Sequence, residues 1–238
     1  MAVLLGSSLA PRQATARRAI VVLDAGHGGS NLGAAGRAPA ALEKRLTLAI
    51  TKEVARLLED RADVDVVLTR RDDRFITLRE RVRLANKAGG DLFLSIHLNA
   101  SPDHLQQGFE TWIVSPEALD VDARAMRWGD GPTRPGVSEE LAAMLDDVER
   151  GAALPRSAAL AARMQARLGE LRGVTRGRGV MQGSQDVLLG LGMPGALVEV
   201  GFIDHATEGE ELLDPAVRSK IAGALAQAII DWLGPRTP

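Results

Sequence analysis

The feature that most constrains the fold is an alternation between short apolar runs and amphipathic helical segments along the whole chain. Several of these runs are rich in β-branched residues, which favour strands. They lie at residues 19–23, 64–69, 91–96, 109–114 and 196–200. Strands that alternate with helices predict an α/β fold, a single domain with a twisted, mostly parallel or mixed β-sheet and helices on both faces.

Three of the helices carry recognisable start or stop signals. One begins near Glu43 and repeats apolar residues at helical spacing. A second begins at Thr77, which forms a capping-box pattern with Glu80, and ends at two consecutive glycines. The last begins at Asp214, followed by a proline, and ends at Gly234. These signals predict where the chain enters and leaves the helical layers.

The alternation of predicted strands and helices is interrupted in two places. Residues 1–18 are small and apolar at first, and we interpret them either as the remnant of a secretion signal or as a frayed N-terminus. Residues 115–156 contain more proline and glycine than a crossover connection needs, and we interpret this stretch as an insertion in a catalytic domain that spans residues 19–234. Within the insertion, a helix is predicted after Ser138. Its apolar face would comprise Val137, Leu141, Met144, Leu145 and Val148.

Composition excludes several classes of protein. The 29 basic and 31 acidic residues give a net charge of −2, which argues against a nucleic-acid partner. The chain has no cysteine, so any metal must be held by histidines and carboxylates. No stretch approaches the roughly 18 apolar residues of a transmembrane helix. We expect a monomer with no transmembrane segment.

Four side chains are candidates for metal chemistry. His27 follows the first predicted strand, His97 follows the third, and Glu199 lies near the end of the last. Ligands bind at the carboxyl ends of strands in open α/β sheets, so these side chains are expected to converge with Glu43. Each alone also fits a polar residue with a purely structural role. Two imidazoles and a carboxylate with an open fourth position are typical of catalytic Zn²⁺.

A nucleotide-binding interpretation of the glycine-rich loop is weaker. The segment GHGGSN at residues 26–31 begins like a dinucleotide-binding motif, but Asn31 stands where the third glycine belongs. A histidine in the middle of such a loop would also crowd the pyrophosphate. The metal interpretation therefore accounts better for this loop.

Four motifs occur in the order DAGHGG (24–29), LEK (42–44), SIHLN (95–99) and VEVGFI (198–203). Together they resemble the bacterial zinc-dependent N-acetylmuramoyl-L-alanine amidases, the amidase type 3 family of cell-wall hydrolases, over roughly residues 20–233. The resemblance implies a zinc phosphorylase/hydrolase-like fold. It also implies that His27, Glu43 and His97 hold zinc and that Glu199 is the catalytic glutamate.

The implied reaction is hydrolysis of the amide between the lactyl group of N-acetylmuramic acid and L-alanine in peptidoglycan. Zinc would acidify a water molecule and polarise the carbonyl, and Glu199 would move the proton to the departing amine. The implied location is the periplasm or another exported position in the cell envelope. Two alternatives remain: a non-catalytic peptidoglycan-binding module that retains the fold, and a zinc peptidase or deacylase that acts on another amide.

Other residues are expected to support the site or to shape its surroundings. Asp24 is expected to orient the loop, to hydrogen-bond a ligating imidazole or to cap a turn, and Arg81 is expected to be a helix-surface or ion-pair residue. His104 is interpreted as a solvated loop histidine, and His205 occupies a position where family members often carry asparagine. Leu189 stands where a basic residue is frequent in the family, so the peptide preference is open.

The insertion has a regulatory hypothesis. Some division-associated amidases that resemble this chain carry a helix here that covers the zinc until an activator protein displaces it. By that resemblance, Glu139, Glu140 or Glu149 would supply a blocking carboxylate. The alternative is an amphipathic flap whose glutamates simply face water.

Overall fold

The computed structural model describes residues 17–39, 41–119 and 136–235. Most of the predicted N-terminal segment and part of the predicted insertion therefore lie outside the described residues. Within them, six strands form one sheet in the order β2-β1-β3-β6-β4-β5. The strands are β1 (Ala19–Ala25), β2 (Val64–Leu68), β3 (Leu92–Asn99), β4 (Phe109–Val114), β5 (Gly177–Gly183) and β6 (Gly195–Phe202).

The sheet is mixed, as predicted. β2, β1, β3 and β6 run parallel to one another, whereas β4 is antiparallel to β6 and parallel to β5. Buried positions alternate between the two faces, so one strand supplies side chains to two cores. The parallel strands place their carboxyl ends at one edge, which is where the candidate site lies.

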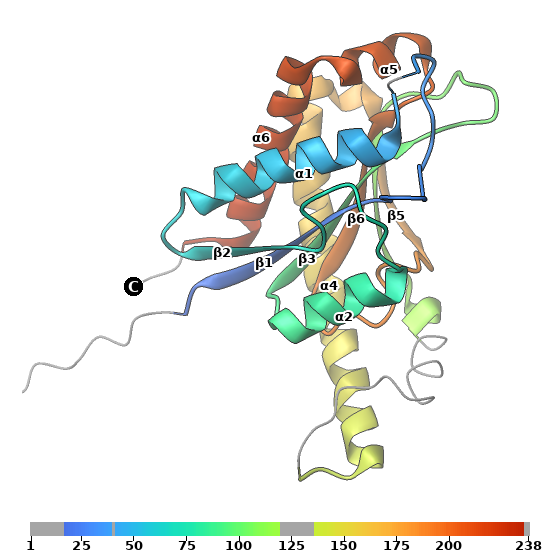
Figure 1. Cartoon of the computed structure of the whole chain (residues 1–238). Coiled ribbons are helices and arrows are strands. Elements are labelled where there is room, and N and C mark those ends of the chain that lie inside the picture. Colours follow the sequence, from blue (N-terminus) through green and yellow to red (C-terminus); the bar gives the residue numbers. More distant parts are fainter. Residues whose placement is uncertain (1–16, 40, 120–135, 236–238) are drawn as a thin grey trace, which may run out of the picture.

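Helices cover both faces of this sheet (Figure 1). On one face α1 (Glu43–Glu59), α4 (Glu139–Arg172) and α6 (Pro215–Leu233) pack over the larger core. On the other, α2 (Leu78–Ala88) packs with the loop before β6 over a smaller core. A short helix, α5 (Ala206–Leu213), follows β6. The predicted single α/β domain with a mixed sheet is confirmed.

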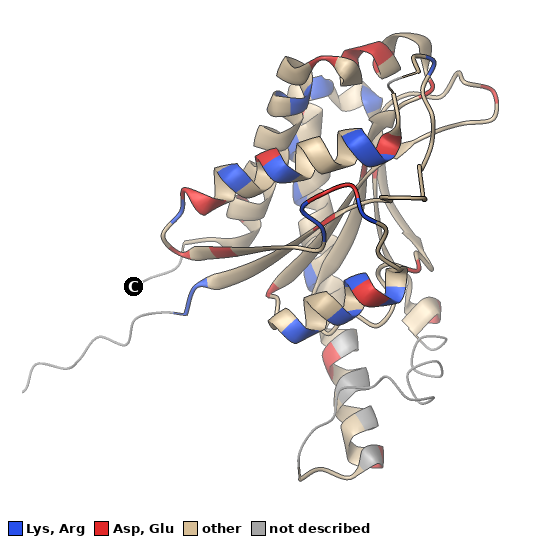
Figure 2. Ribbon diagram, viewed as in Figure 1, with Lys and Arg blue, Asp and Glu red and all other residues tan. Residues whose placement is uncertain are grey.

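The predicted helix signals have the expected structures. Thr77 accepts from the Glu80 backbone amide, and the Glu80 side chain accepts in return, forming a complete capping box. The Asp214 side chain caps α6 by accepting from the Ala216 amide. Basic and acidic positions alternate along the ribbons of α1 and α2 (Figure 2).

Helix α4 differs from the expectation at Pro155. Pro155 is one of the prolines that mark the predicted insertion at residues 115–156, but α4 continues through it and has 34 residues in all. The helix changes character near that point. Leu160 and Met164 are fully buried, whereas Met144 and Val148 are 62% and 69% exposed. Packing of its second half against the sheet outweighs the cost of a proline within a helix. The division into domain and insertion stays a prediction.

Candidate active site

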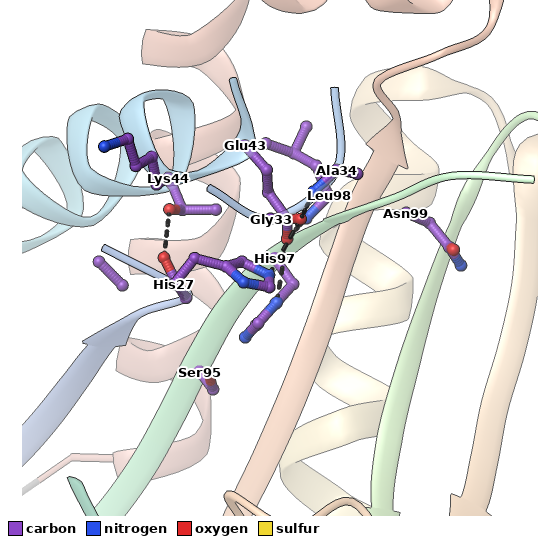
Figure 3. Close-up of polar contacts among 12 residues, drawn as sticks. His27, Gly33, Ala34, Glu43, Lys44, Ser95, His97, Leu98 and Asn99 are labelled. Atoms are coloured by element: carbon purple, nitrogen blue, oxygen red, sulfur yellow. Dashed lines mark hydrogen bonds and ion pairs between the residues drawn. The ribbon is translucent and has the colours of Figure 1, made fainter. Parts of the chain in front are cut away.

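Four chain segments bring the candidate residues together. His27 lies two residues beyond the end of β1, and Glu43 is the first residue of α1. His97 and Glu199 lie inside β3 and β6, which run further than predicted, and they are paired across the two strands. Because β1, β3 and β6 are parallel, the same edge of the sheet receives all of these residues. Figure 3 shows the two imidazoles and the Glu43 carboxylate directed toward one another.

The Glu43 carboxylate lies between the two imidazoles. Its Oε2 is 3.0 Å from His27 Nε2, and its Oε1 is 3.0 Å from His97 Nδ1. One ligand atom from each residue lies within 4.8 Å of the other two. The carboxylate also accepts from the backbone amides of Ala34 (2.8 Å) and Leu98 (3.0 Å), which fix its orientation.

This donor set fits a zinc ion. Zinc binds imidazole nitrogen and carboxylate oxygen at about 2.0–2.2 Å, so ligand atoms around one ion lie roughly 3–4 Å apart. Glycines leave the necessary space. A Cβ at Gly33, where φ is +69°, would lie 2.5 Å from Glu43 Oε2, and a Cβ at Gly26 would lie 2.4 Å from the His97 ring. Side chains at either position would push the donors apart.

Proton affinities in the cluster follow from its contacts. Burial by itself would raise the pKa of Glu43, but hydrogen bonds and charges of His27 and His97 outweigh burial and lower that pKa to about 2. Burial would lower the pKa of His27, but the Glu43 carboxylate raises it above its usual value of 6.5. The carboxylate is therefore ionised at neutral pH and offers a full negative charge to a cation.

Comparison with known proteins decides the family. A family model described as N-acetylmuramoyl-L-alanine amidase matches residues 21–231. The chain belongs to this family. The predicted enzyme class, an amidase that hydrolyses peptidoglycan, is thereby confirmed.

Relatives and solved structures agree with this assignment. The chain is 31% identical over 221 residues to the amidase AmiA of Escherichia coli, covering 90% of this chain and 75% of that protein. The crystal structure of an N-acetylmuramoyl-L-alanine amidase from Clostridium difficile 630 matches with a TM-score of 0.72 and 27% identity, covering 92% and 98% of the two chains. AmiC2 of Nostoc punctiforme matches with a TM-score of 0.69 and 27% identity, covering 90% and 97%.

In this amidase, Glu199 lies beside the His27–Glu43–His97 cluster. Its Oε2 atom is buried and has no hydrogen-bond partner among the described residues. Burial, together with the negative charges of Glu43 and Glu110, raises the pKa of Glu199 well above its usual value. A carboxyl group with a raised pKa and an unpartnered oxygen is suited to accept and release a proton.

Two buried arginines hold the loop that carries His27. Arg81 donates to Asp24 (2.6 Å) and to the carbonyl oxygens of Ala25 (2.7 Å) and His27 (2.6 Å), and Arg70 donates to the Ala25 carbonyl (2.9 Å). His27 has a φ of 60°, a left-handed conformation that is costly outside glycine. These bonds stabilise that conformation. Asp24 accepts from Arg81, Thr69 and Ser95, so it supports the loop through Arg81. Arg81 forms an ion pair in the interior and not on a helix surface.

The other two histidines have structural contacts. His104 Nδ1 lies 2.7 Å from Asp204 Oδ2, and the His104 side chain is 60% exposed. His205 is the N-cap of α5, where its ring accepts from the Glu208 backbone amide. Asparagine would cap a helix in the same way.

Sequence reasoning missed a second polar group beside Glu199. Glu110 in β4 is paired with Glu199 across the strands and is buried. It accepts from Asn99 Nδ2 (2.9 Å), Trp112 Nε1 (3.0 Å) and Arg178 Nε (2.7 Å). A glutamate within the apolar run FETWIV was the signal that marked this position.

Proposed function

We propose that this amidase cleaves the amide between the lactyl group of N-acetylmuramic acid and L-alanine with one Zn²⁺ held by His27, Glu43 and His97. The observation that carries the proposal is the convergence of those three donors within 4.8 Å, beside a glutamate with an unpartnered buried oxygen. Zinc bound there would supply a Lewis acid that polarises the amide carbonyl and acidifies a water molecule.

The chain's own residues would carry the proton. Glu199 would accept a proton from the attacking water and then donate it to the nitrogen of the departing amine. The Glu43 carboxylate is ionised at neutral pH and is oriented by two backbone amides. It would direct its negative charge toward the bound cation. The Arg81 and Arg70 bonds would hold His27 in place throughout.

A non-catalytic wall-binding module is the alternative from another class. Such a module has no use for a proton shuttle, and the buried, unpartnered Oε2 of Glu199 is costly to maintain without one. A zinc peptidase or deacylase with the same donors differs only in the bond that it cleaves. The products of the reaction separate all three.

The test is a Glu199→Gln variant assayed on purified sacculi, with zinc quantified in both proteins. The zinc-loaded wild type should release peptides with a free N-terminal L-alanine and leave the glycan intact, as read by mass spectrometry. The variant should retain its zinc and lose about 10²–10⁴-fold in turnover, as expected for a general acid–base group. Cleavage of another bond, or an unimpaired variant, would overturn the proposal.

The location and regulation are also proposed. We infer that the protein is exported to the cell envelope, in the periplasm or its equivalent, because its substrate lies there. Among the described residues, no helix is both long and apolar enough to cross a bilayer. We further propose that an activator displaces the insertion at residues 115–156, in a role connected with cell division. The CwlD amidase of Clostridioides difficile was solved in complex with the GerS lipoprotein.

The exposed part of α4 supports that regulatory proposal. In Figure 1 this first half of the helix projects beyond the sheet. Leu141, Met144, Leu145 and Val148 are each at least 38% exposed there, at helical spacing. Apolar side chains arranged in this way are suited to bind another surface. Glu140 and Glu149 also lie on exposed positions of this half, and the side chain of Glu139 lies outside the description.

A further inference from the structure

Arg178 is a cation held in a fixed position near the reacting groups. It belongs to β5, at the edge of the sheet. Its Nε donates to Glu110 Oε2 at 2.7 Å, and its Nη1 donates to Gln106 Oε1 at 3.0 Å. Its Cζ atom lies 5.2 Å from the centre of the Phe202 ring. Contacts on two edges and one face therefore fix the plane of the guanidinium.

The third nitrogen of this guanidinium is available. Nη2 donates to no residue that the structure describes, and the side chain is 37% exposed, against 6% for Glu110. A planar guanidinium recognises carboxylates through parallel N–H donors. Because the fork is already immobilised, a ligand that binds it loses little side-chain entropy.

The position of Arg178 relative to Glu199 follows from strand register. His97, Glu199 and Glu110 are paired across β3, β6 and β4. Directly opposed residues on antiparallel strands have Cβ atoms about 4.5–5.5 Å apart. Arg178 then contacts the far side of Glu110. The order across the sheet is therefore His97, Glu199, Glu110 and Arg178.

We propose that Arg178 binds a carboxylate on the peptide portion of the substrate, on the residue that follows L-alanine. This inference rests on the proposed function, because Glu199 donates its proton to the nitrogen that begins the peptide. The peptide must therefore lead away from Glu199. Arg178 lies two strands away from Glu199, across β4, in the direction in which an extended peptide of one or two residues would reach it.

Three other cationic side chains near the site are bound to protein groups or buried. Lys44 donates to Asp73 and to the Gly29 carbonyl, and its side chain is 9% exposed. Arg70 and Arg81 are buried behind the metal loop. Arg178, by contrast, combines partial exposure, a fixed plane and an available donor.

The test compares two substrates on the same short glycan chain. Both carry L-alanyl-D-glutamate with the γ-carboxyl capped as a methylamide, and they differ only in a free α-carboxylate or its carboxamide. The zinc-loaded wild type should prefer the carboxylate in kcat/KM by about 10–100-fold, the size of one charge-assisted hydrogen bond, mainly through KM. In Arg178→Gln the preference should fall to about one.

Two further variants separate recognition from structure. Arg61→Gln removes an equally exposed arginine that pairs with Asp63 at the turn before β2, and it should leave the preference unchanged. Arg178→Lys keeps the charge that balances Glu110 and should retain part of the preference. It also serves if the glutamine variant is unstable.

Failure of this inference is distinguishable from failure of the proposed function. If the wild type hydrolyses both substrates equally well, or if Arg178→Gln and Arg178→Lys slow both by the same factor, Arg178 does not read the carboxylate. If the zinc-loaded wild type releases no peptide from either substrate, the proposed function fails, and this inference fails with it.

Discussion

The His27–Glu43–His97 cluster and the first half of α4 are opposites in how completely folding satisfies their side chains. Glu43 is only 3% exposed, and each of its carboxylate oxygens has protein partners. In α4, Met144 and Val148 remain 62% and 69% exposed. The cluster is assembled by core strands and a helix start, whereas the first half of α4 extends beyond the sheet (Figure 1).

This difference separates the requirements of a catalytic site from those of a surface that binds a partner. A catalytic site must hold its donors within a fraction of an ångström, which requires rigid elements and supporting hydrogen bonds. When another surface covers an apolar helix face that was exposed to water, the free energy of the system falls. The polar groups of the cluster are satisfied within this chain, whereas the exposed apolar side chains of α4 are suited to bind another surface.

The largest expected effect removes one donor from the cluster. His97→Ala should weaken zinc binding by more than the 10–100-fold typical of losing an outer partner of a ligand, because it removes the ligand itself. Activity on sacculi should fall with it. His104→Ala is the matched control, since His104 is exposed and contacts Asp204. Equal zinc affinity in both variants, measured by chelator competition, would contradict the assignment.

The second prediction contrasts the two halves of α4. Leu160→Ala opens a cavity at a fully buried position and should lower the free energy of unfolding by about 2–5 kcal/mol. Met144→Ala, at a position 62% exposed, should change it by less than about 0.5 kcal/mol. Denaturant unfolding measures both. A large loss for Met144→Ala would mean that the first half of α4 is packed in solution.

The third prediction concerns pH. Glu43 raises the pKa of His27 above 6.5, so zinc must displace a proton at lower pH. Zinc affinity should fall by about tenfold per pH unit for that proton once the pH lies below this raised pKa. In the metal-free protein, low pH has the opposite effect: it stabilises the fold through His27 and does not weaken it. The His27 contribution to stability is complete below pH 6.5 and is lost as the pH rises through the raised pKa. A zinc affinity independent of pH between 5 and 7 would contradict this account.

The smallest effect should come from the insertion. Deletion of residues 120–150 should raise hydrolysis of sacculi several-fold if this segment covers the site. The variants Glu140→Gln and Glu149→Gln test for a blocking carboxylate without removing the chain. Unchanged or lower activity in a deletion variant that keeps its melting temperature would favour a simple solvated flap.

Sequence patterns predicted some elements well and missed others for physical reasons. β1, β4 and α6 have strong apolar periodicity or clear caps, and their predicted positions agree with the structure. β5, with the sequence GRGVMQG, lies at the sheet edge and buries little, so it has no apolar signal. α5 has eight residues and is preceded by His205, an uncommon N-cap.

The sequence by itself determined the chemistry that is available. Without cysteine, and with two histidines and a glutamate next to predicted strands and a helix start, it specified a nitrogen and oxygen donor set and the family to which the chain belongs. Only the tertiary structure decided which polar groups meet. The register of β3, β6 and β4 aligns His97, Glu199 and Glu110, and the edge position of β5 adds Arg178. Register depends on contacts between residues far apart in the chain, which local patterns do not encode.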